Sequence, residues 1–115
     1  MARLEVSGSE VVVRLSAPEK LGAFHGNVRV PRQAVKEVRV AASPWREVRG
    51  LRAPGTAFPG LIALGTFRGR GWKDFVAIYR KRRGVVLELG ENASGFRRIV
   101  LSDDSPEETV ARLQA

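Results

Sequence analysis

The chain has 115 residues, a formal net charge of +8 and no cysteine. This length suits a single core, so we expect residues 1–115 to fold as one domain. The lack of cysteine excludes disulfides and thiolate sites. The sequence has no apolar run long enough to span a bilayer, and its N-terminus has no signal-peptide core. We therefore expect a cytoplasmic protein.

Alternating apolar and polar residues predict strands in the first third of the chain, at residues 10–15 and 27–30. The segment between them, SAPEKLGAFHG, is expected to be a loop. Residues 32–41 fit two readings, because Val35 and Val38 suit a helical turn whereas Val38 and Val40 suit a strand. We favour a short turn that leads into a strand, since β-branched residues are frequent there and no helix cap is obvious.

The second half of the chain is expected to be mostly β. Glycine and proline are dense in residues 45–60, which predicts an irregular connection with one short strand. Alternation returns at residues 61–68 and is followed by a glycine-containing turn. Residues 73–79, 85–89 and 96–101 then alternate in succession, which predicts an antiparallel meander.

A short helix is predicted for residues 105–114, at the end of the chain. Ser105 and Glu108 form a capping-box pattern, and Pro106 occupies the first helical position, where its missing N–H costs nothing. A helix of this length is not stable alone in water, so it must pack on the sheet. Val110 and Leu113 are the expected contact residues.

Positive charge is concentrated between residues 68 and 83, where seven basic residues face a single carboxylate. Trp72 lies among them as a candidate aromatic contact for a base or a membrane interface. Because adjacent turns of a meander emerge at opposite ends, we expect two basic patches rather than one. The alternative is that these are solvated turns and that Trp72 covers the core edge. The candidate anion-binding residues are Arg68, Arg70, Lys73, Arg80, Lys81, Arg82 and Arg83.

No catalytic residue, cofactor site or metal site is predicted. His25 is the only histidine, and with no cysteine it cannot build a transition-metal cluster. Asp103 and Asp104 are adjacent carboxylates, but their position just before a helix favours a capping role over glycosidase chemistry. The glycines of GTFRGRG do not match a nucleotide-binding loop.

The order of elements, with a capped C-terminal helix, resembles the bacterial pleckstrin-homology-like (PH-like) domain. The stretch NVRVPRQAVKEVRV is similar to a strand, turn and strand of such domains, and GLRAPGTAFPGLIALGTFRGRGWKDFVAIYR is similar to a group of small uncharacterised actinobacterial proteins. The resemblance implies a bent antiparallel sheet or barrel of about seven strands, closed by the helix at 105–114. Phosphoinositide-binding relatives carry several basic residues in an early loop, where this chain offers only Lys20.

We therefore expect a mostly β, non-enzymatic binding or self-assembly module that acts through protein–protein contact. The alternative, of a different class, is electrostatic binding of anionic phospholipid or nucleic acid through the arginine-rich turns.

Overall fold

The chain forms two β-sheets and two α-helices in this computed structural model, which describes residues 1–114 apart from the side chains of residues 52–54. The smaller sheet has the order β1-β2-β3, from Arg3–Ser7, Glu10–Arg14 and Val28–Pro31. The larger sheet has the order β4-β8-β9-β7-β6-β5. Its strands, in chain order, are Val35–Ala41, Leu51–Phe58, Ile62–Gly69, Trp72–Tyr79, Gly84–Leu89 and Phe96–Ser102. The helices are α1 at Ala17–Ala23 and α2 at Pro106–Gln114, and the 3-10 turns are η1 at Arg32–Ala34 and η2 at Pro44–Glu47.

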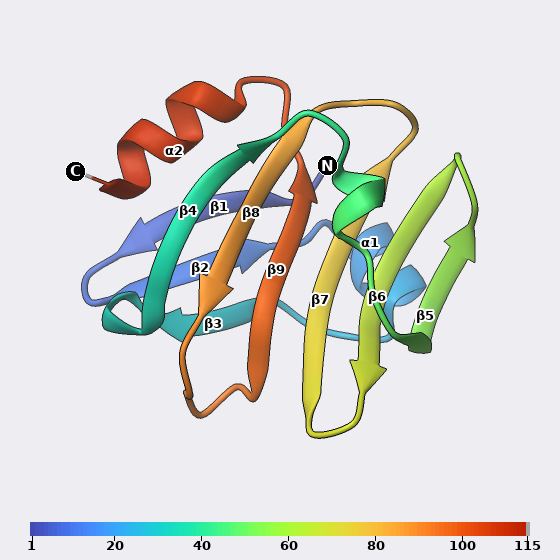
Figure 1. Ribbon diagram of the computed structural model, residues 1–115, viewed down its shortest axis with the longest axis horizontal. Coiled ribbons are helices and arrows are strands. Elements are labelled where there is room, and N and C mark those ends of the chain that lie inside the picture. The colour runs from blue at the N-terminus through green and yellow to red at the C-terminus, as the bar shows by residue number, and fades with distance from the viewer. Residues whose placement is uncertain (115) are drawn as a thin grey trace.

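The main core fills the space between the two sheets. The smaller sheet lies behind the larger one, α1 packs behind β5 and β6, and α2 packs beside β4 (Figure 1). Alternate residues of β7, β8 and β9 face this core, as their period-2 pattern predicts. Phe75, Leu87 and Ile99 are fully buried there, against Val11 and Val30 of the smaller sheet.

The outer face of the larger sheet carries a second, smaller core. Val76, Ile78, Val86 and Val100 are buried on it, beneath the β4–β5 connection that contributes Trp45, among others. Burial on both faces explains why β7, β8 and β9 read as nearly continuous apolar runs.

The predicted meander is wrong, because β9 lies between β7 and β8. It pairs parallel to β7 and antiparallel to β8, and the 80–83 connection carries the chain over the position that β9 fills. Alternation specifies which face a side chain takes but not which strand lies next to which, and all three strands alternate alike.

The expected single bent sheet or barrel of about seven strands is also wrong, and no closed barrel forms among the described residues. The described residues form nine strands in two sheets that no ladder joins, and β1 at the N-terminus was not predicted. The chain passes from one sheet to the other through η1, which interrupts strand geometry between β3 and β4. The coarser prediction, a mostly β fold with a C-terminal helix, is confirmed.

The predicted loop between β2 and β3 contains α1. Ser16 caps it by accepting a hydrogen bond from Glu19 N, and the Glu19 carboxylate accepts one from Ser16 N at 2.9 Å, which completes a capping box. The pattern S-x-x-E was therefore readable in the sequence. Gly22 lets the helix approach the sheet, since a Cβ there would lie 3.0 Å from the Leu64 side chain.

The expected turn and strand over residues 32–41 are confirmed as η1 and β4. The 45–60 connection contains the single expected strand, β5, but this strand is eight residues long.

The C-terminal helix is confirmed, and it packs as predicted through Leu113, which is buried, and Val110. Asp103 holds its start: the carboxylate accepts hydrogen bonds from Ser105 N at 2.7 Å and from the Thr109 hydroxyl at 2.6 Å. The capping role expected for this residue is thus what the geometry provides.

Candidate functional site

The seven candidate anion-binding residues occupy the two ends of β7. Arg68, Arg70 and Lys73 lie around the β6–β7 turn, and residues 80–83 form the β7–β8 connection. Seven residue steps along β7 lead from Lys73 to Arg80, which separates the two groups by roughly 23 Å at about 3.3 Å per residue. The structure therefore does not bring these residues together.

At the β6–β7 turn, two of the candidates are occupied by contacts within the fold. The guanidinium carbon of Arg49 lies 4.3 Å from the Trp72 ring centroid, and the indole covers Gly69 so closely that a Cβ there would lie 2.1 Å from the ring. The Lys73 ammonium lies 4.5 Å from the Phe96 ring. Trp72 is thus a packing residue that covers the edge of the sheet, and its face is covered by Arg49.

At the other end of β7, half of the basic residues are paired with acids around α2. Arg82 binds Asp104 at 2.5 Å, and Arg83 binds both oxygens of Glu107. The Glu107 hydrogen bonds raise the pKa of Arg83, and the same contact lowers the pKa of Glu107. Arg80 and Lys81 are exposed, and no ion pair of the described residues involves them.

An ion-pair network crosses the outer face of the larger sheet. Arg39 donates to Glu47 at 2.8 Å and to Glu88 at 3.0 Å, and Arg98 also binds Glu88 at 3.0 Å. The hydrogen bond from Arg39 is the main cause of the lowered pKa of Glu47. The network fixes the end of η2 over β4, β8 and β9, which is a structural role.

A buried carboxylate links α1 to β7. Glu19 is only 5% exposed, and it accepts hydrogen bonds from Ser16 N and from the Tyr79 hydroxyl. Burial acts to raise its pKa, but these hydrogen bonds outweigh burial and leave the pKa lowered. Burial and the Glu19 contact together raise the pKa of Tyr79.

His25 is half-buried and packs against two buried aromatic rings. Its ring centroid lies 5.6 Å from those of both Phe75 and Phe96, and its Nδ1 is 2.7 Å from the Gly26 carbonyl oxygen. Within residues 1–114 there is no group of three or more His, Asp or Glu side chains able to hold a metal ion.

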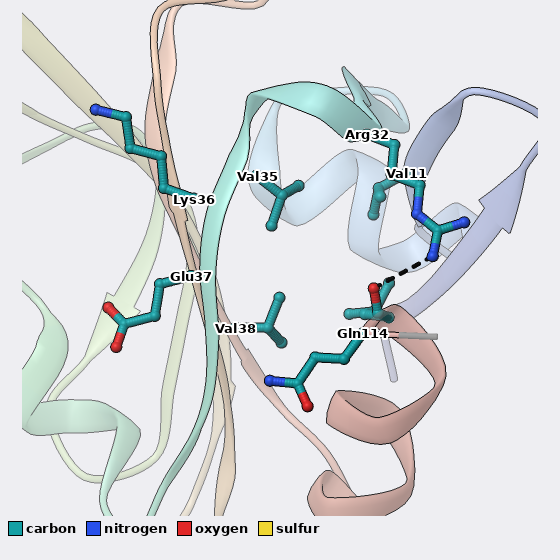
Figure 2. Close-up of a pocket in the computed structure, with 8 residues that line it drawn as sticks. Val11, Arg32, Val35, Lys36, Glu37, Val38 and Gln114 are labelled. Carbon is teal, nitrogen blue, oxygen red and sulfur yellow. Dashed lines mark hydrogen bonds between the residues drawn. The ribbon is translucent and has the colours of Figure 1, made fainter.

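A groove that the sequence did not predict runs between β4 and α2, with a volume of about 450 Å³. Figure 2 shows Val35 and Val38 projecting from β4 toward α2, whereas Lys36 and Glu37 project from the opposite side of the strand. Arg32 closes one end by donating to the Leu113 carbonyl at 3.4 Å. The groove lining combines apolar side chains from three elements with charges at its border: Val11, Arg32, Val35, Lys36, Glu37, Val38, Leu113 and Gln114.

The groove lies beside a free sheet edge. β4 pairs with β8 on one side, and no described strand pairs with its other side. Its apolar residues Val35, Val38 and Val40 are only partly buried, unlike those of the central strands. Only the tertiary contact with α2 creates this site, so no local sequence signal announces it.

The other edge of the larger sheet is β5, which also has no second partner among the strands described here and is built differently. Pro54 lies within this strand and has no backbone N–H to donate, and the pairing with β6 shifts register between Arg52 and Gly55. Both features discourage a further strand from pairing there, whereas β4 contains no proline.

Among the described residues, no helix is long and apolar enough to cross a membrane. Comparison with known proteins found no matching family model, no matching curated protein and no matching solved structure.

Proposed function

We propose that this protein is a non-enzymatic protein-binding module, and that an extended segment of a partner protein pairs with the free edge of β4. One observation carries the proposal: this edge borders a groove, lined by both apolar and charged side chains, on the side where α2 packs. In strand addition, main-chain hydrogen bonds supply affinity and pockets for alternate side chains supply specificity. The edge and the groove provide these two elements side by side.

The lining of the groove favours a particular kind of segment. Val35 and Val38 face into it over buried Val11 and Leu113, so inward-facing residues of the partner are expected to be apolar. Arg32 and Lys36 outnumber Glu37 at its border, and the whole chain carries a charge of +8. We therefore propose that the partner segment carries acidic residues next to its apolar ones.

The contrast with β5 supports the choice of edge. An unprotected edge is a hazard, because it templates aggregation, and proteins commonly blunt such edges with proline and bulges. Here β5 carries both devices. β4 has a register shift at its start, between Val35 and Glu37, and the remaining five residues of its ladder, from Glu37 to Ala41, pair regularly.

Selection of linear peptides from a displayed library, followed by amide chemical-shift mapping, tests the proposal. Peptides that bind should shift the amides of residues 35–40 and 110–114. Lys36→Glu should weaken the binding of these peptides several-fold. Lys81→Glu makes an equal change in charge at a distant exposed lysine and should not weaken it. Selected peptides that map elsewhere, or that tolerate Lys36→Glu, would overturn the proposal.

Self-association is a second way to occupy the same edge, because two copies of β4 can pair antiparallel. A dimer in sedimentation, with the same amide shifts at β4, would identify the partner segment as a second copy. The β-rich body followed by one C-terminal helix also supports the proposed relation to PH-like domains at the level of element order. That relation is not needed for the binding proposal.

A further inference from the structure

Two large apolar side chains stand exposed at the turn between β5 and β6. Phe58 is 60% exposed and Leu61 is 54% exposed. The turn between them has Pro59 and then Gly60 with φ of 81°, and Leu61 N donates to Phe58 O at 2.9 Å, as in a type II β-turn. The turn is therefore rigid and holds both side chains outside the core. We call Phe58 and Leu61 the apolar tip.

The basic β7–β8 connection adjoins the apolar tip. Arg80 N donates to Leu61 O at 2.9 Å, and Trp45 Nε1 donates to Arg80 O at 2.7 Å. Arg80 adopts φ of 51°, an uncommon conformation for a residue other than glycine, and these two hydrogen bonds hold it there. A hollow of about 500 Å³ lies at the junction, lined in part by Leu61, Tyr79, Arg80 and Arg82.

The basic residues of the β7–β8 connection that lie nearest to Leu61 are not neutralised by an acidic partner among the described residues. Asp104 and Glu107 pair with Arg82 and Arg83, toward α2. Arg80 and Lys81 remain exposed, outside every ion pair of the described residues. Apolar side chains that stand beside unpaired cations match the two layers of an anionic bilayer surface, its acyl chains and its phosphate groups.

We propose that this end of the sheet docks on an anionic phospholipid bilayer. Phe58 and Leu61 enter the boundary between headgroups and acyl chains, and Arg80 and Lys81 bind lipid phosphates. Nucleic acid is a poorer fit, because its backbone would engage the two cations and leave Leu61 in water. Each cation near a surface of this kind contributes on the order of 1 kcal/mol, so the apolar tip is needed as well.

The proposed membrane surface is separate from the β4 groove. In Figure 1 the β5–β6 turn and the β7–β8 connection lie along the upper edge of the larger sheet, whereas β4 begins at the lower left. A protein docked by the apolar tip therefore keeps the start of β4 exposed. The two proposals stand on different residues and can fail independently.

Co-sedimentation of the full chain with vesicles tests the inference. The protein should bind vesicles of mixed phosphatidylserine and phosphatidylcholine, and bind poorly to phosphatidylcholine alone, with affinity that falls as salt rises. The double variant Phe58→Ser and Leu61→Ser should bind about tenfold more weakly or worse, because it loses two insertable side chains. Lys81→Glu should also weaken binding.

Two control variants separate insertion from general surface effects. Leu51→Ser removes a side chain that is 80% exposed at the opposite end of β5, and Lys36→Glu matches the charge change of Lys81→Glu. Both should bind vesicles as the parent protein does. Equal binding to neutral vesicles, no vesicle binding at low salt, or equal losses in tip and control variants would overturn the inference.

Discussion

The Tyr79 hydroxyl donates a hydrogen bond to the buried Glu19 carboxylate, and so connects the first helix of the chain to a central region of the larger sheet. A buried carboxylate needs such donors, because leaving a buried acceptor unsatisfied costs more than the bond itself contributes. Tyr79→Phe should therefore lower the free energy of unfolding by about 1–3 kcal/mol. Urea denaturation near neutral pH measures this change. The difference should shrink when Glu19 is protonated, because the charge-assisted bond is then lost.

Acid should destabilise the protein in a defined window. The pKa values of Glu19 and Glu47 are both lowered in the folded state, Glu19 by hydrogen bonds that outweigh its burial and Glu47 chiefly by Arg39. At a pH between the folded-state and unfolded-state pKa values of each carboxyl group, the unfolded chain therefore binds more protons than the folded protein. Their stabilisation is complete above the unfolded pKa of about 4.3 and is lost as pH falls through the folded pKa. In a plot of the unfolding free energy against pH, Glu47→Gln should reduce the slope on the acidic side. An unchanged slope there would contradict this account.

The start of α2 should depend on Asp103 more than on Ser105. Asp103 accepts hydrogen bonds from both Ser105 N and the Thr109 hydroxyl. Asp103→Ala should cost about 1 kcal/mol of unfolding free energy, in the range usual for lost helix caps. Ser105→Ala is the comparison. A larger loss for Ser105→Ala would show that the capping box predicted from the sequence, rather than Asp103, holds this helix end.

Gly69 should tolerate no side chain. A Cβ at this position would lie 2.1 Å from the Trp72 ring, which is itself covered by Arg49. Gly69→Ala should therefore displace Trp72, destabilise the fold by about 1–3 kcal/mol and change the near-ultraviolet dichroism of the indole. Gly26→Ala is the matched control, because nothing lies within 4 Å of its Cβ position. Similar effects of the two substitutions would argue against tight packing at Trp72.

Sequence patterns predicted faces better than neighbours. The alternation of Val85, Leu87 and Leu89 correctly placed these side chains on one face, and all three lie in the core between the sheets. The same pattern could not show that β9 separates β7 from β8. The alternation of residues along a strand does not depend on which strands it pairs with. The prediction of a meander was wrong for that reason. The prediction that the two basic turns lie apart did not depend on the order of the strands, because the two turns lie at opposite ends of β7.

The candidate surfaces were predictable only in part. The basic turn at residues 80–83 was visible in the sequence, but the pairing of Arg82 and Arg83 with acids near α2 was not. Trp72 was conspicuous as an aromatic residue among basic ones, and its partner Arg49 lies 23 positions away. The Pro-Gly turn that holds the apolar tip is recognisable in the sequence. The exposure of Phe58 and Leu61 is known only from the folded structure.

The position of β9 makes the larger sheet depend on a strand that is translated late. β4 and β8 lie on one side of it, and β7, β6 and β5 lie on the other, and no other strand of the described residues pairs across the gap. A nascent chain that ends before Phe96 therefore holds two partial sheets with open inner edges. Completion of the fold by insertion of a central strand, through long-range and partly parallel pairing, predicts slow folding and a late, cooperative closure.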